Sequence, residues 1–447
     1  MAKIFGTDGV RSKVNAEPMT TETCLKIARS VGHILSKKHE INRVVISKDT
    51  RLSGYVFEPV IASGFSSMGS EVLLVGPLPT PALAMLVGTL RADIGIMITA
   101  SHNTFEYNGL KIFDKDGNKI PQELENQIEE IIFNEDKYNL IIQKNLITGK
   151  TKRLEDAVGR YTESIKNSFP KNKSLKGLKI VIDCANGANY KVAPEVLWEL
   201  GSDVVTIENS PNGKNINLNC GAVNPSKLSQ KVISENADIG FAFDGDGDRL
   251  IVVDENGEIM DGDKIVALLA TEFLKQKKLK NGLVVSTHMS NMAFEKYINK
   301  IGLNLIRTQV GDKYVIEKMR ETNASIGGEQ SGHIIIKDYS KTGDGLLVAV
   351  QISNILISSN KKTSEIFDLY EALPQVQTSV EVIDKNKSFY KNKDLQKFIM
   401  NFNDQNDNLR LLIRPSGTEP VIRILVEGNN LESLKSISNE VQKMIVG

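Results

Sequence analysis

Short runs of β-branched residues alternate with longer amphipathic stretches through most of the chain, and this alternation restricts the fold more than any other feature. The runs are predicted as strands, at 43–47, 71–75, 94–98, 178–182, 204–207, 239–243, 250–253, 283–286 and 303–306. The stretches between them are predicted as helices, at 21–38, 54–68, 122–132, 190–200, 261–275, 289–299, 312–320 and 345–358. Such alternation predicts an α/β fold with mixed, largely parallel sheets.

A tetrapeptide of the form Ala-x-Ile-Gly occurs three times, beginning at Ala92, Ala237 and Ala324. The first two copies open predicted strands, the third is a weaker copy, and all three precede unusually polar loops. A chance recurrence of four residues is the alternative interpretation. Because ligands of open α/β sheets bind at the carboxyl ends of the strands, we expect three related α/β units that each deliver one polar loop to a site.

The character of the sequence changes after about residue 365, where Asn and Lys become frequent. Two predicted strands, at 410–413 and 421–426, and a helix near 431–444 indicate a smaller α+β domain. The length of 447 residues suggests about three domains, with four possible. We expect domains at 1–153, 154–253, 254–364 and 365–447.

Charge and cysteine content exclude several classes of protein. Lys and Arg total 55 and Asp and Glu total 55, so the chain has no bulk attraction for nucleic acid or anionic membranes. No apolar run is long enough for a transmembrane helix, and the first residues lack the apolar stretch of a secretory signal. Cys24, Cys184 and Cys220 are too few and too scattered for a disulfide scaffold or a zinc site. We therefore expect a cytoplasmic protein without nucleic-acid or membrane partners.

Three carboxylates fall within five residues at Asp244, Asp246 and Asp248, and glycines separate them. Two carboxylates about 4 Å apart repel by roughly 4 kcal/mol at an effective dielectric near 20, so such a cluster needs a cation. Because every candidate ligand atom is oxygen, Mg²⁺ is favoured over zinc. An EF-hand would also place Glu255 at its twelfth position, but Arg249 stands where that loop needs glycine. A solvated acidic turn fits poorly between two apolar strands.

Ser101 and His102 lie in the first polar loop, and Lys111 follows ten residues after Ser101. In isolation, Ser-His-Asn is a common turn sequence. On a loop equivalent to the acidic loop, it becomes a candidate nucleophile or phosphate carrier. The chain contains neither GxSxG nor GxxxxGK[ST], which disfavours a serine hydrolase and a P-loop kinase.

Two further segments are candidate binding loops. Residues 327–333 offer a carboxylate, a hydroxyl and an imidazole, which suit hydrogen bonding to sugar hydroxyls, although a polar glycine turn is an equal alternative. Residues 414–420, with Arg423 shortly after them, combine two arginines, hydroxyls and glycine amides. These are the parts of an anion site without a metal, and an ordinary Pro-Gly turn is the alternative.

Taken together and in this order, the four loops resemble those of the α-D-phosphohexomutases over nearly the whole chain. Within this superfamily the chain most resembles the bacterial enzymes that act on glucosamine phosphate. Two positions depart from the family pattern: Thr104 stands where proline is usual after Ser-His-Asn, and Ser12 stands where glycine is usual. The stretches that carry the likeness are 5–11, 213–217, 310–315, 328–333 and 342–347.

The resemblance implies four domains around a central cleft, with Ser101 carried as a phosphoserine. The phosphate of Ser101 is implied to hold one Mg²⁺ per chain together with Asp244, Asp246 and Asp248. Lys111 and His333 are implied to lie near the transferring phosphoryl group as candidates for proton transfer, and Arg11 and Arg249 are implied to help set the catalytic site. The residues implied to bind the substrate are His102, Glu329, Ser331, Arg414, Ser416, Gly417, Thr418 and Arg423.

The implied reaction interconverts glucosamine 6-phosphate and glucosamine 1-phosphate through the phosphoserine and a 1,6-bisphosphate intermediate. The chain would then be an isomerase of amino-sugar metabolism that supplies UDP-N-acetylglucosamine for the cell wall, with a hexose 1,6-bisphosphate as its activator. We expect a monomer or a homodimer. Gln330 in the third loop favours the amino sugar. A phosphomannomutase or phosphoglucomutase, a metal-dependent phosphatase and a non-catalytic phosphosugar-binding protein are the alternatives.

Overall fold

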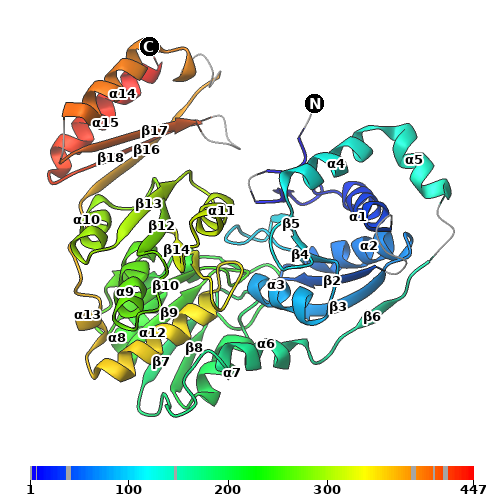
Figure 1. Ribbon diagram of the computed structural model, residues 1–447, viewed down its shortest axis with the longest axis horizontal. Coiled ribbons are helices and arrows are strands. Elements are labelled where there is room, and N and C mark those ends of the chain that lie inside the picture. Colours follow the sequence, from blue (N-terminus) through cyan, green and yellow to red (C-terminus); the bar gives the residue numbers. More distant parts are fainter. Residues whose placement is uncertain are drawn as a thin grey trace.

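The computed structural model describes residues 3–6, 8–36, 42–144, 148–383, 389–405, 408–415 and 421–446. Within these ranges the chain forms four sheets, of six, five, four and three strands, and we call the parts built on them units 1 to 4 in chain order. Figure 1 shows the blue-to-cyan unit 1 on one side, the green and yellow units 2 and 3 on the other, and the small orange-to-red unit 4. The expected fold class, three related α/β units and a smaller C-terminal α+β unit, is confirmed.

Unit 1 is built on a six-stranded sheet in the order β1-β5-β4-β2-β3-β6. Its strands are β1 (Val10–Lys13), β2 (Arg43–Lys48), β3 (Glu71–Pro77), β4 (Ile94–Ile98), β5 (Tyr107–Asp114) and β6 (Thr151–Arg153). Its helices are α1 (Thr21–Ser36), α2 (Gly54–Ser66), α3 (Thr80–Thr89), α4 (Gln122–Phe133) and α5 (Glu135–Lys144). The strands β2, β3, β4 and β6 run parallel, whereas β5 is antiparallel to its neighbours β4 and β1.

Units 2 and 3 have sheet orders β11-β10-β9-β7-β8 and β13-β12-β14-β15. The elements of unit 2 are α6 (Ala157–Lys166), β7 (Lys179–Asp183), α7 (Val192–Glu199), β8 (Asp203–Ile207), the 3₁₀ helix η1 (Gly221–Val223), α8 (Ser226–Glu235), β9 (Ile239–Phe243), β10 (Leu250–Asp254) and β11 (Ile259–Met260). The elements of unit 3 are α9 (Gly262–Lys275), β12 (Leu283–Thr287), α10 (Met292–Lys300), β13 (Asn304–Thr308), α11 (Asp312–Thr322), β14 (Ile326–Gly328), β15 (Ile334–Ile336), α12 (Gly345–Ser359) and α13 (Thr363–Ile366).

One strand arrangement recurs in units 1, 2 and 3. Three parallel strands, in the orders β3-β2-β4, β8-β7-β9 and β13-β12-β14, are extended by one antiparallel strand, which is β5, β10 or β15. The polar loops at 99–106, 244–249 and 329–333 each join the third parallel strand to the antiparallel one. The Ala-x-Ile-Gly copies therefore mark a structural repeat and not a chance recurrence.

A continuous apolar core joins units 1, 2 and 3. The helix α12 is buried along most of its length and packs against α6, α9, β9, β10 and β15. A single cluster of buried apolar side chains extends from Val45 of unit 1 to Phe367. A second cluster lies beneath α1, α2 and α4, and unit 4 has a core of its own. Buried apolar surface thus fixes the first three units to one another.

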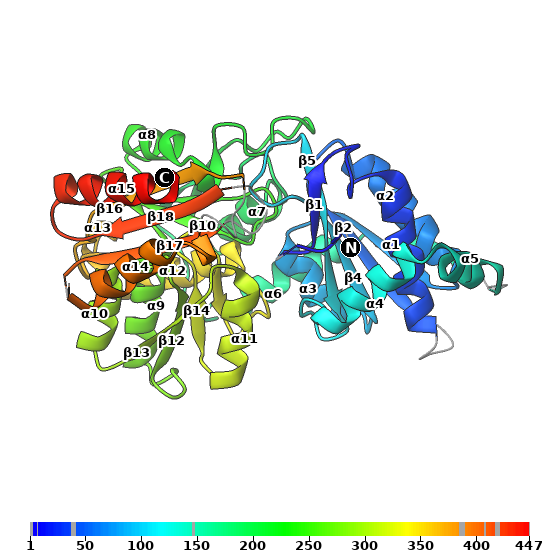
Figure 2. The same ribbon diagram turned by 90° about the horizontal axis from the view of Figure 1, so that it is seen from above.

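Unit 4 is an antiparallel sheet with the strand order β16-β18-β17 and two helices. Figures 1 and 2 place it over unit 3 and away from unit 1. The buried carboxylate of Glu427 pairs with Arg410 at 2.6 Å and accepts a hydrogen bond from the backbone N–H of Met292 in unit 3 at 2.7 Å. The junction between units 3 and 4 therefore includes a polar contact to a buried carboxylate. The elements of unit 4 are β16 (Gln375–Glu381), α14 (Lys393–Gln405), β17 (Arg410–Pro415), β18 (Val421–Glu427) and α15 (Leu431–Val446).

The predicted strands and helices are confirmed to within three residues at each end wherever the structure describes them. The prediction missed β5, because its polar residues Asn108 and Lys111 interrupt the apolar pattern although both are buried. It also missed α3, which is buried on nearly all sides and therefore lacks a polar face with helical spacing. Among the described residues, no helix combines the length and apolar character needed to span a membrane.

Asp344 precedes α12 and ties it to α6. Its Oδ1 accepts hydrogen bonds from the backbone N–H of Leu347 at 2.9 Å and from the hydroxyl of Tyr161 at 2.8 Å. Burial raises the pKa of Asp344 from 3.8 to about 6. A carboxyl with a raised pKa in the folded state contributes stability that is fully present below the unfolded pKa and is lost as the pH rises through the folded pKa.

We predict that Asp344→Asn removes this loss of stability, because Asn keeps an acceptor oxygen for both bonds but does not titrate. The difference in the free energy of unfolding, variant minus unsubstituted chain, should therefore increase by about 3 kcal/mol between about pH 4 and pH 8. Urea denaturation followed by circular dichroism at each pH measures the difference. Parallel stability curves for the two proteins would contradict the prediction.

Candidate active site

The polar loops of units 1, 2 and 3 meet at one cavity of about 410 Å³, which strands β17 and β18 of unit 4 also line. This volume is typical of a small-molecule site. The cavity brings together most of the site residues predicted from the sequence: Arg11, Ser101, His102, Asp248, Arg249, Glu329, Ser331, His333, Arg414 and Arg423. The predicted residues Lys111, Asp244 and Asp246 lie behind this lining and are buried.

Ser101 lies at the beginning of the loop after β4 and is 1% exposed. Its backbone has a φ of 50°, in the left-handed region that residues other than glycine rarely adopt. Its Oγ donates a hydrogen bond to Asp244 Oδ2 at 2.7 Å and lies 3.4 Å from His102 Nδ1. The hydroxyl therefore stands between the acidic loop and the cavity.

Asp244, Asp246 and Asp248 each place a carboxylate oxygen within 4.8 Å of the other two, and all three residues are buried. Gly245 makes this packing possible. A Cβ at that position would stand 2.7 Å from the carbonyl oxygen of Ser101, so any larger residue would push the first loop away from the acidic loop. Gly245 therefore allows the Ser101 loop and the acidic loop to approach each other closely.

The acidic loop has the donor set of a divalent-cation site. Lys111 Nζ donates to Asp246 Oδ2 and to Asp248 Oδ2, both at 2.8 Å, and so balances part of the charge. Burial raises the pKa of Asp244 well above its usual value, and Asp248 and Asp246 raise it further. Asp246 Oδ1 is buried and accepts no hydrogen bond from any described residue. A cluster whose candidate ligand atoms are all oxygens, one of them buried without a hydrogen-bond donor, fits Mg²⁺.

His333 faces the acidic loop from unit 3. Its Nδ1 lies 3.5 Å from Asp248 Oδ1, and its Nε2 lies 3.8 Å from Asp312 Oδ2. The backbone N–H of Gly343 donates to Nε2 at 3.1 Å, so a neutral ring carries its proton on Nδ1. Burial lowers the pKa of His333, but the neighbouring carboxylates Asp248 and Asp312 outweigh it, so that the pKa is raised overall. The ring can therefore hold a proton beside the cavity.

Asp8, Lys119 and Asp312 belong to the same charged cluster, although the sequence analysis did not select them. Lys119 Nζ contacts the carboxylates of both Asp8 and Asp312, so it bridges units 1 and 3. Asp8 also lies 3.6 Å from Lys111 Nζ. Burial raises the pKa of Asp8, but Lys111 and Lys119 hold it below its usual value overall. The side walls of the cavity are thus joined by partly buried ion pairs.

Arg11 connects the N-terminal motif to the first polar loop. It donates to Asp8 Oδ2 at 2.8 Å and to Asn103 Oδ1 at 3.2 Å. Asp8 shares the stretch 5–11 with Arg11, and that stretch was the signal that could have identified Asp8. Lys119 lies in the connection between β5 and α4, where no motif marks it.

The third loop presents Glu329 and Ser331 to the cavity. Glu329 is mostly buried, its Oε1 accepts the backbone N–H of Gly311 at 3.1 Å, and burial raises its pKa. Gln330 differs from its neighbours, because its side chain donates to Asp261 Oδ2 at 3.2 Å and does not line the cavity. The structure therefore does not place Gln330 where it could select a sugar directly.

His102 and Arg249 line the cavity beside Ser101. Burial, together with the positive charges of Arg249 and Arg11, lowers the pKa of His102 to about 3, so this ring is neutral near pH 7. Arg249 Nε lies 4.0 Å from Asp248 Oδ1 and makes no hydrogen bond within the described part of the chain. This N–H group is available to an anionic ligand.

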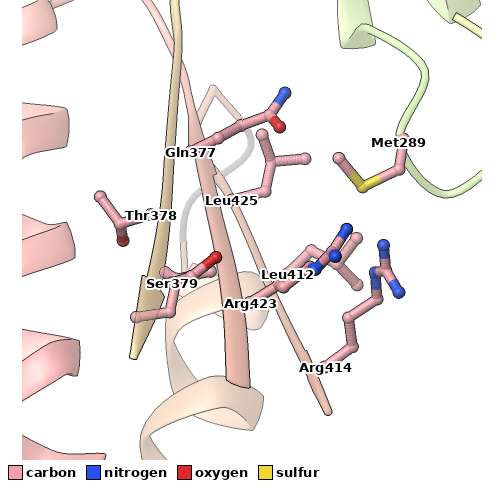
Figure 3. A pocket seen from close by; sticks show the side chains of 9 residues that line it. Met289, Gln377, Thr378, Ser379, Leu412, Arg414, Arg423 and Leu425 are labelled. Atoms are coloured by element: carbon pink, nitrogen blue, oxygen red, sulfur yellow. The ribbon is translucent and has the colours of Figure 1, made fainter. Parts of the chain in front are cut away.

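Arg414 and Arg423 are paired across β17 and β18 and therefore lie on one face of the sheet. Figure 3 shows both side chains pointing toward the loop of unit 3 that carries Met289, in a side pocket of about 190 Å³ next to the main cavity. Burial and the charge of Arg423 lower the pKa of Arg414. Three other residues predicted for this phosphate site lie outside the described residues: Ser416, Gly417 and Thr418.

Family models match all four parts of the chain. They are the alpha/beta/alpha domains I, II and III of phosphoglucomutase/phosphomannomutase, at residues 2–139, 159–257 and 261–373, and the C-terminal domain of the same family, at residues 378–444. The phosphoglucosamine mutase of Parvibaculum lavamentivorans is 48% identical over 99% of this chain and 98% of its own length. The phosphoglucosamine mutase of Nautilia profundicola is 49% identical over 97% of each chain.

Solved structures share the fold at lower sequence identity. A phosphoglucomutase/phosphomannomutase family protein of Burkholderia thailandensis has a TM-score of 0.83 at 24% identity, over 99% of this chain and 96% of its own. An Aspergillus fumigatus N-acetylphosphoglucosamine mutase, solved with GlcNAc-6P and magnesium, has a TM-score of 0.68 at 18% identity, over 99% and 95%. The chain belongs to the phosphoglucomutase/phosphomannomutase family and, within it, to the phosphoglucosamine mutases, which are isomerases.

Proposed function

We propose that the chain interconverts glucosamine 6-phosphate and glucosamine 1-phosphate, with Ser101 as the carrier of the phosphoryl group. The observation that supports this most is the Ser101 hydroxyl, buried against Asp244 at 2.7 Å, in a cavity that Arg414 and Arg423 also line. A reactive hydroxyl and a separate pair of arginines suit a ligand with phosphate groups at two positions. The amino sugar is taken from the relatives named phosphoglucosamine mutase.

In the proposed cycle, transfer breaks the bond between phosphorus and Ser101 Oγ and joins phosphorus to the free hydroxyl of the phosphosugar. The proton of the attacking hydroxyl is passed by way of His333 to the departing Oγ, so that Ser101 leaves as a hydroxyl and a 1,6-bisphosphate results. After the bisphosphate turns over in the cavity, its other phosphoryl group moves to Oγ, and the Oγ proton passes to the departing sugar oxygen. Burial lowers the pKa of Lys111, but Asp246, Asp248 and Asp8 raise it well above its usual value overall, so Lys111 stays charged and stabilises the transferring group.

Mg²⁺ is the proposed metal, and Asp244, Asp246 and Asp248 are its proposed protein ligands, together with the phosphate on Ser101. When bound, the ion would offset the charge of the transferring phosphoryl group. Arg11 and Arg249 would help to set the transfer site. The residues proposed to bind the phosphosugar are His102, Glu329, Ser331, Arg414, Ser416, Gly417, Thr418 and Arg423.

The wider setting is also a proposal. We place the enzyme in the cytoplasm, as a monomer or homodimer, with a hexose 1,6-bisphosphate as the activator that phosphorylates Ser101. The three cysteines are buried and unpaired, which is compatible with a reducing compartment. The product would feed UDP-N-acetylglucosamine and cell-wall synthesis. The proposed domain limits remain 1–153, 154–253, 254–364 and 365–447.

A comparison of kcat/KM for glucosamine 1-phosphate, glucose 1-phosphate and mannose 1-phosphate tests the proposed substrate. The assay contains Mg²⁺ and a trace of hexose 1,6-bisphosphate. We expect a clear preference for the amino sugar. A preference for a neutral sugar would overturn the substrate assignment, and release of inorganic phosphate as fast as isomerisation would favour a phosphatase.

We predict that Ser101→Ala abolishes most turnover and that its intact mass never gains a phosphoryl group after incubation with the bisphosphate. The reason is that, among the described residues, Ser101 has the hydroxyl that both bonds to the acidic loop and lines the cavity, whereas Thr80, which bonds to Asp246 Oδ2 at 2.5 Å, does not line it. Ser47→Ala is the matched control, because Ser47 is also buried in unit 1 but bonds to the carbonyl of Gly76 at 3.1 Å. Near-normal turnover by Ser101→Ala would remove the carrier role.

We predict that Asp246→Asn raises the Mg²⁺ concentration needed for half-maximal activity by about tenfold or more, because it removes one of three anionic ligands. Calorimetric titration of Mg²⁺ provides a readout that is independent of turnover. Asp254→Asn is the control. Asp254 is buried at the far end of β10, and its Oδ1 accepts the backbone N–H groups of Asn256 and Glu258, which Asn can also bind. An unchanged metal titration for Asp246→Asn would contradict the assignment.

A further inference from the structure

We infer that Arg51 is a positioning residue of the transfer reaction, which acts by holding the backbone of the Ser101 loop in its reactive conformation. Arg51 lies in the turn between β2 and α2, far from every motif considered in the sequence, and it does not line the cavity. The inference rests on the proposed role of Ser101 as the phosphoryl carrier. It assigns no contact between Arg51 and the substrate.

Arg51 is fully buried, and its guanidinium is directed at a single loop. Nη2 donates to the carbonyl oxygen of Ser101 at 3.0 Å and to that of Asn103 at 2.8 Å. Nη1 donates to the carbonyl oxygen of Thr104 at 2.5 Å. Nε donates to Asp49 Oδ2 at 2.8 Å, so the charge is paired. One planar group thus binds three of four consecutive carbonyls.

The loop needs such support, because Ser101 adopts a φ of 50°. The left-handed conformation costs a residue with a Cβ about 1–2 kcal/mol, and it persists only where the surroundings impose it. Asn217 of unit 2 adds two hydrogen bonds, from Nδ2 to the carbonyl oxygens of Ser101 and Asn103, both at 2.8 Å. These contacts hold the carbonyl of Ser101 while leaving its Oγ free for Asp244.

Asp49, the ion-pair partner of Arg51, extends this hydrogen-bond network to the backbone N–H of Ser101. Thr99 Oγ1 donates to Asp49 Oδ2 at 2.6 Å and accepts the backbone N–H of Ser101 at 2.9 Å. Burial raises the pKa of Asp49, and the charge of Arg51 opposes that rise. The Asp49–Arg51 pair therefore holds both backbone groups of Ser101. Arg51 binds the carbonyl directly, and Asp49 holds the N–H through the hydroxyl of Thr99.

Thr104 makes this support more necessary. The phosphohexomutase pattern has proline at this position, and proline would fix the local φ by its ring. Thr104 has no such restriction, and its carbonyl is instead bound by Arg51. In this chain, the hydrogen bond from the buried guanidinium restrains the backbone at Thr104.

Lysine cannot replace this function, because an ammonium is a compact donor and not a planar fork. A displacement of about 1 Å at a reacting atom can slow a reaction by about a hundredfold. Arg414 and Arg423, which are proposed to hold the substrate phosphate, line the cavity from unit 4, whereas Arg51 lies in unit 1 and does not line it. Loss of Arg51 should therefore lower kcat and the rate of Ser101 phosphorylation, with little effect on KM.

The test compares Arg51→Lys with Glu58→Gln in the full-length protein. Glu58 forms a buried pair with Lys48 at 2.8 Å in the same unit, but this pair contacts neither Ser101 nor its loop. For each variant, kcat, KM and the melting temperature are measured, together with the rate at which hexose 1,6-bisphosphate phosphorylates Ser101, read from the intact mass. Glu58→Gln measures how the loss of a buried ion pair changes stability and turnover when the Ser101 loop is not involved.

We expect Arg51→Lys to lower kcat and the phosphorylation rate by about tenfold to a hundredfold, with KM changed less than about threefold. Glu58→Gln should lower the melting temperature while its kcat stays near that of the unsubstituted chain. Equal kcat losses in the two variants at equal loss of melting temperature would overturn the inference. An unchanged phosphorylation rate in folded Arg51→Lys would overturn it as well.

Thr99→Val decides the question if Arg51→Lys melts below the assay temperature. It keeps the shape of the side chain and the charge of Arg51, and it removes only the hydroxyl between Asp49 and the Ser101 amide. A fall in kcat without a rise in KM supports the inference, and normal kcat overturns it. The unsubstituted chain separates the two possible failures. If it is never phosphorylated on Ser101, the proposed function is wrong, and the inference about Arg51 is wrong with it. If it is phosphorylated but the variants behave as the controls do, only the inference about Arg51 is wrong.

Discussion

Asp244, Asp246 and Asp248 hold three carboxylates within 4.8 Å of one another, where water is almost excluded. Each pair at such a distance repels by roughly 4 kcal/mol at an effective dielectric near 20, so other parts of the chain must supply compensating groups. Lys111 comes from β5 of unit 1, and His333 comes from the third loop of unit 3. The negative charge of one short acidic loop in unit 2 is therefore balanced by residues from units 1 and 3.

The compensating groups form a closed ring in which carboxylates alternate with lysine and histidine side chains. Removing one member of a buried ion pair leaves its partner unpaired, which costs more than the pair itself contributes, so each member constrains the position of the next. Arg51 acts in the same way on the backbone of the Ser101 loop. Unit 4 takes no part in the ring. The members of the ring, in order, are Asp8, Lys111, Asp248, His333, Asp312 and Lys119.

Much of the fold could be read from the sequence because its elements have clear local patterns. The strands β4 and β9 were predicted with their observed limits, since both are apolar runs that end at a polar loop. The strand β5 was missed for the opposite reason, because Asn108 and Lys111 face a buried site and break the apolar pattern. Pattern analysis fails where polar residues face one another inside the protein, and it also missed α6 and α8, whose polar residues face water.

The sequence by itself determined the α/β repeat, the family and the loops that form the cavity, because each of these depends on residues adjacent in the chain. Only the tertiary structure decided which distant residues support those loops. Lys119 and Asp312 are 193 positions apart, and Arg51 binds a loop 50 positions further along the chain. The geometry also removed Gln330 from the cavity, although it stands between two residues that line it. Such contacts arise from the packing of whole sheets, which no local spacing encodes.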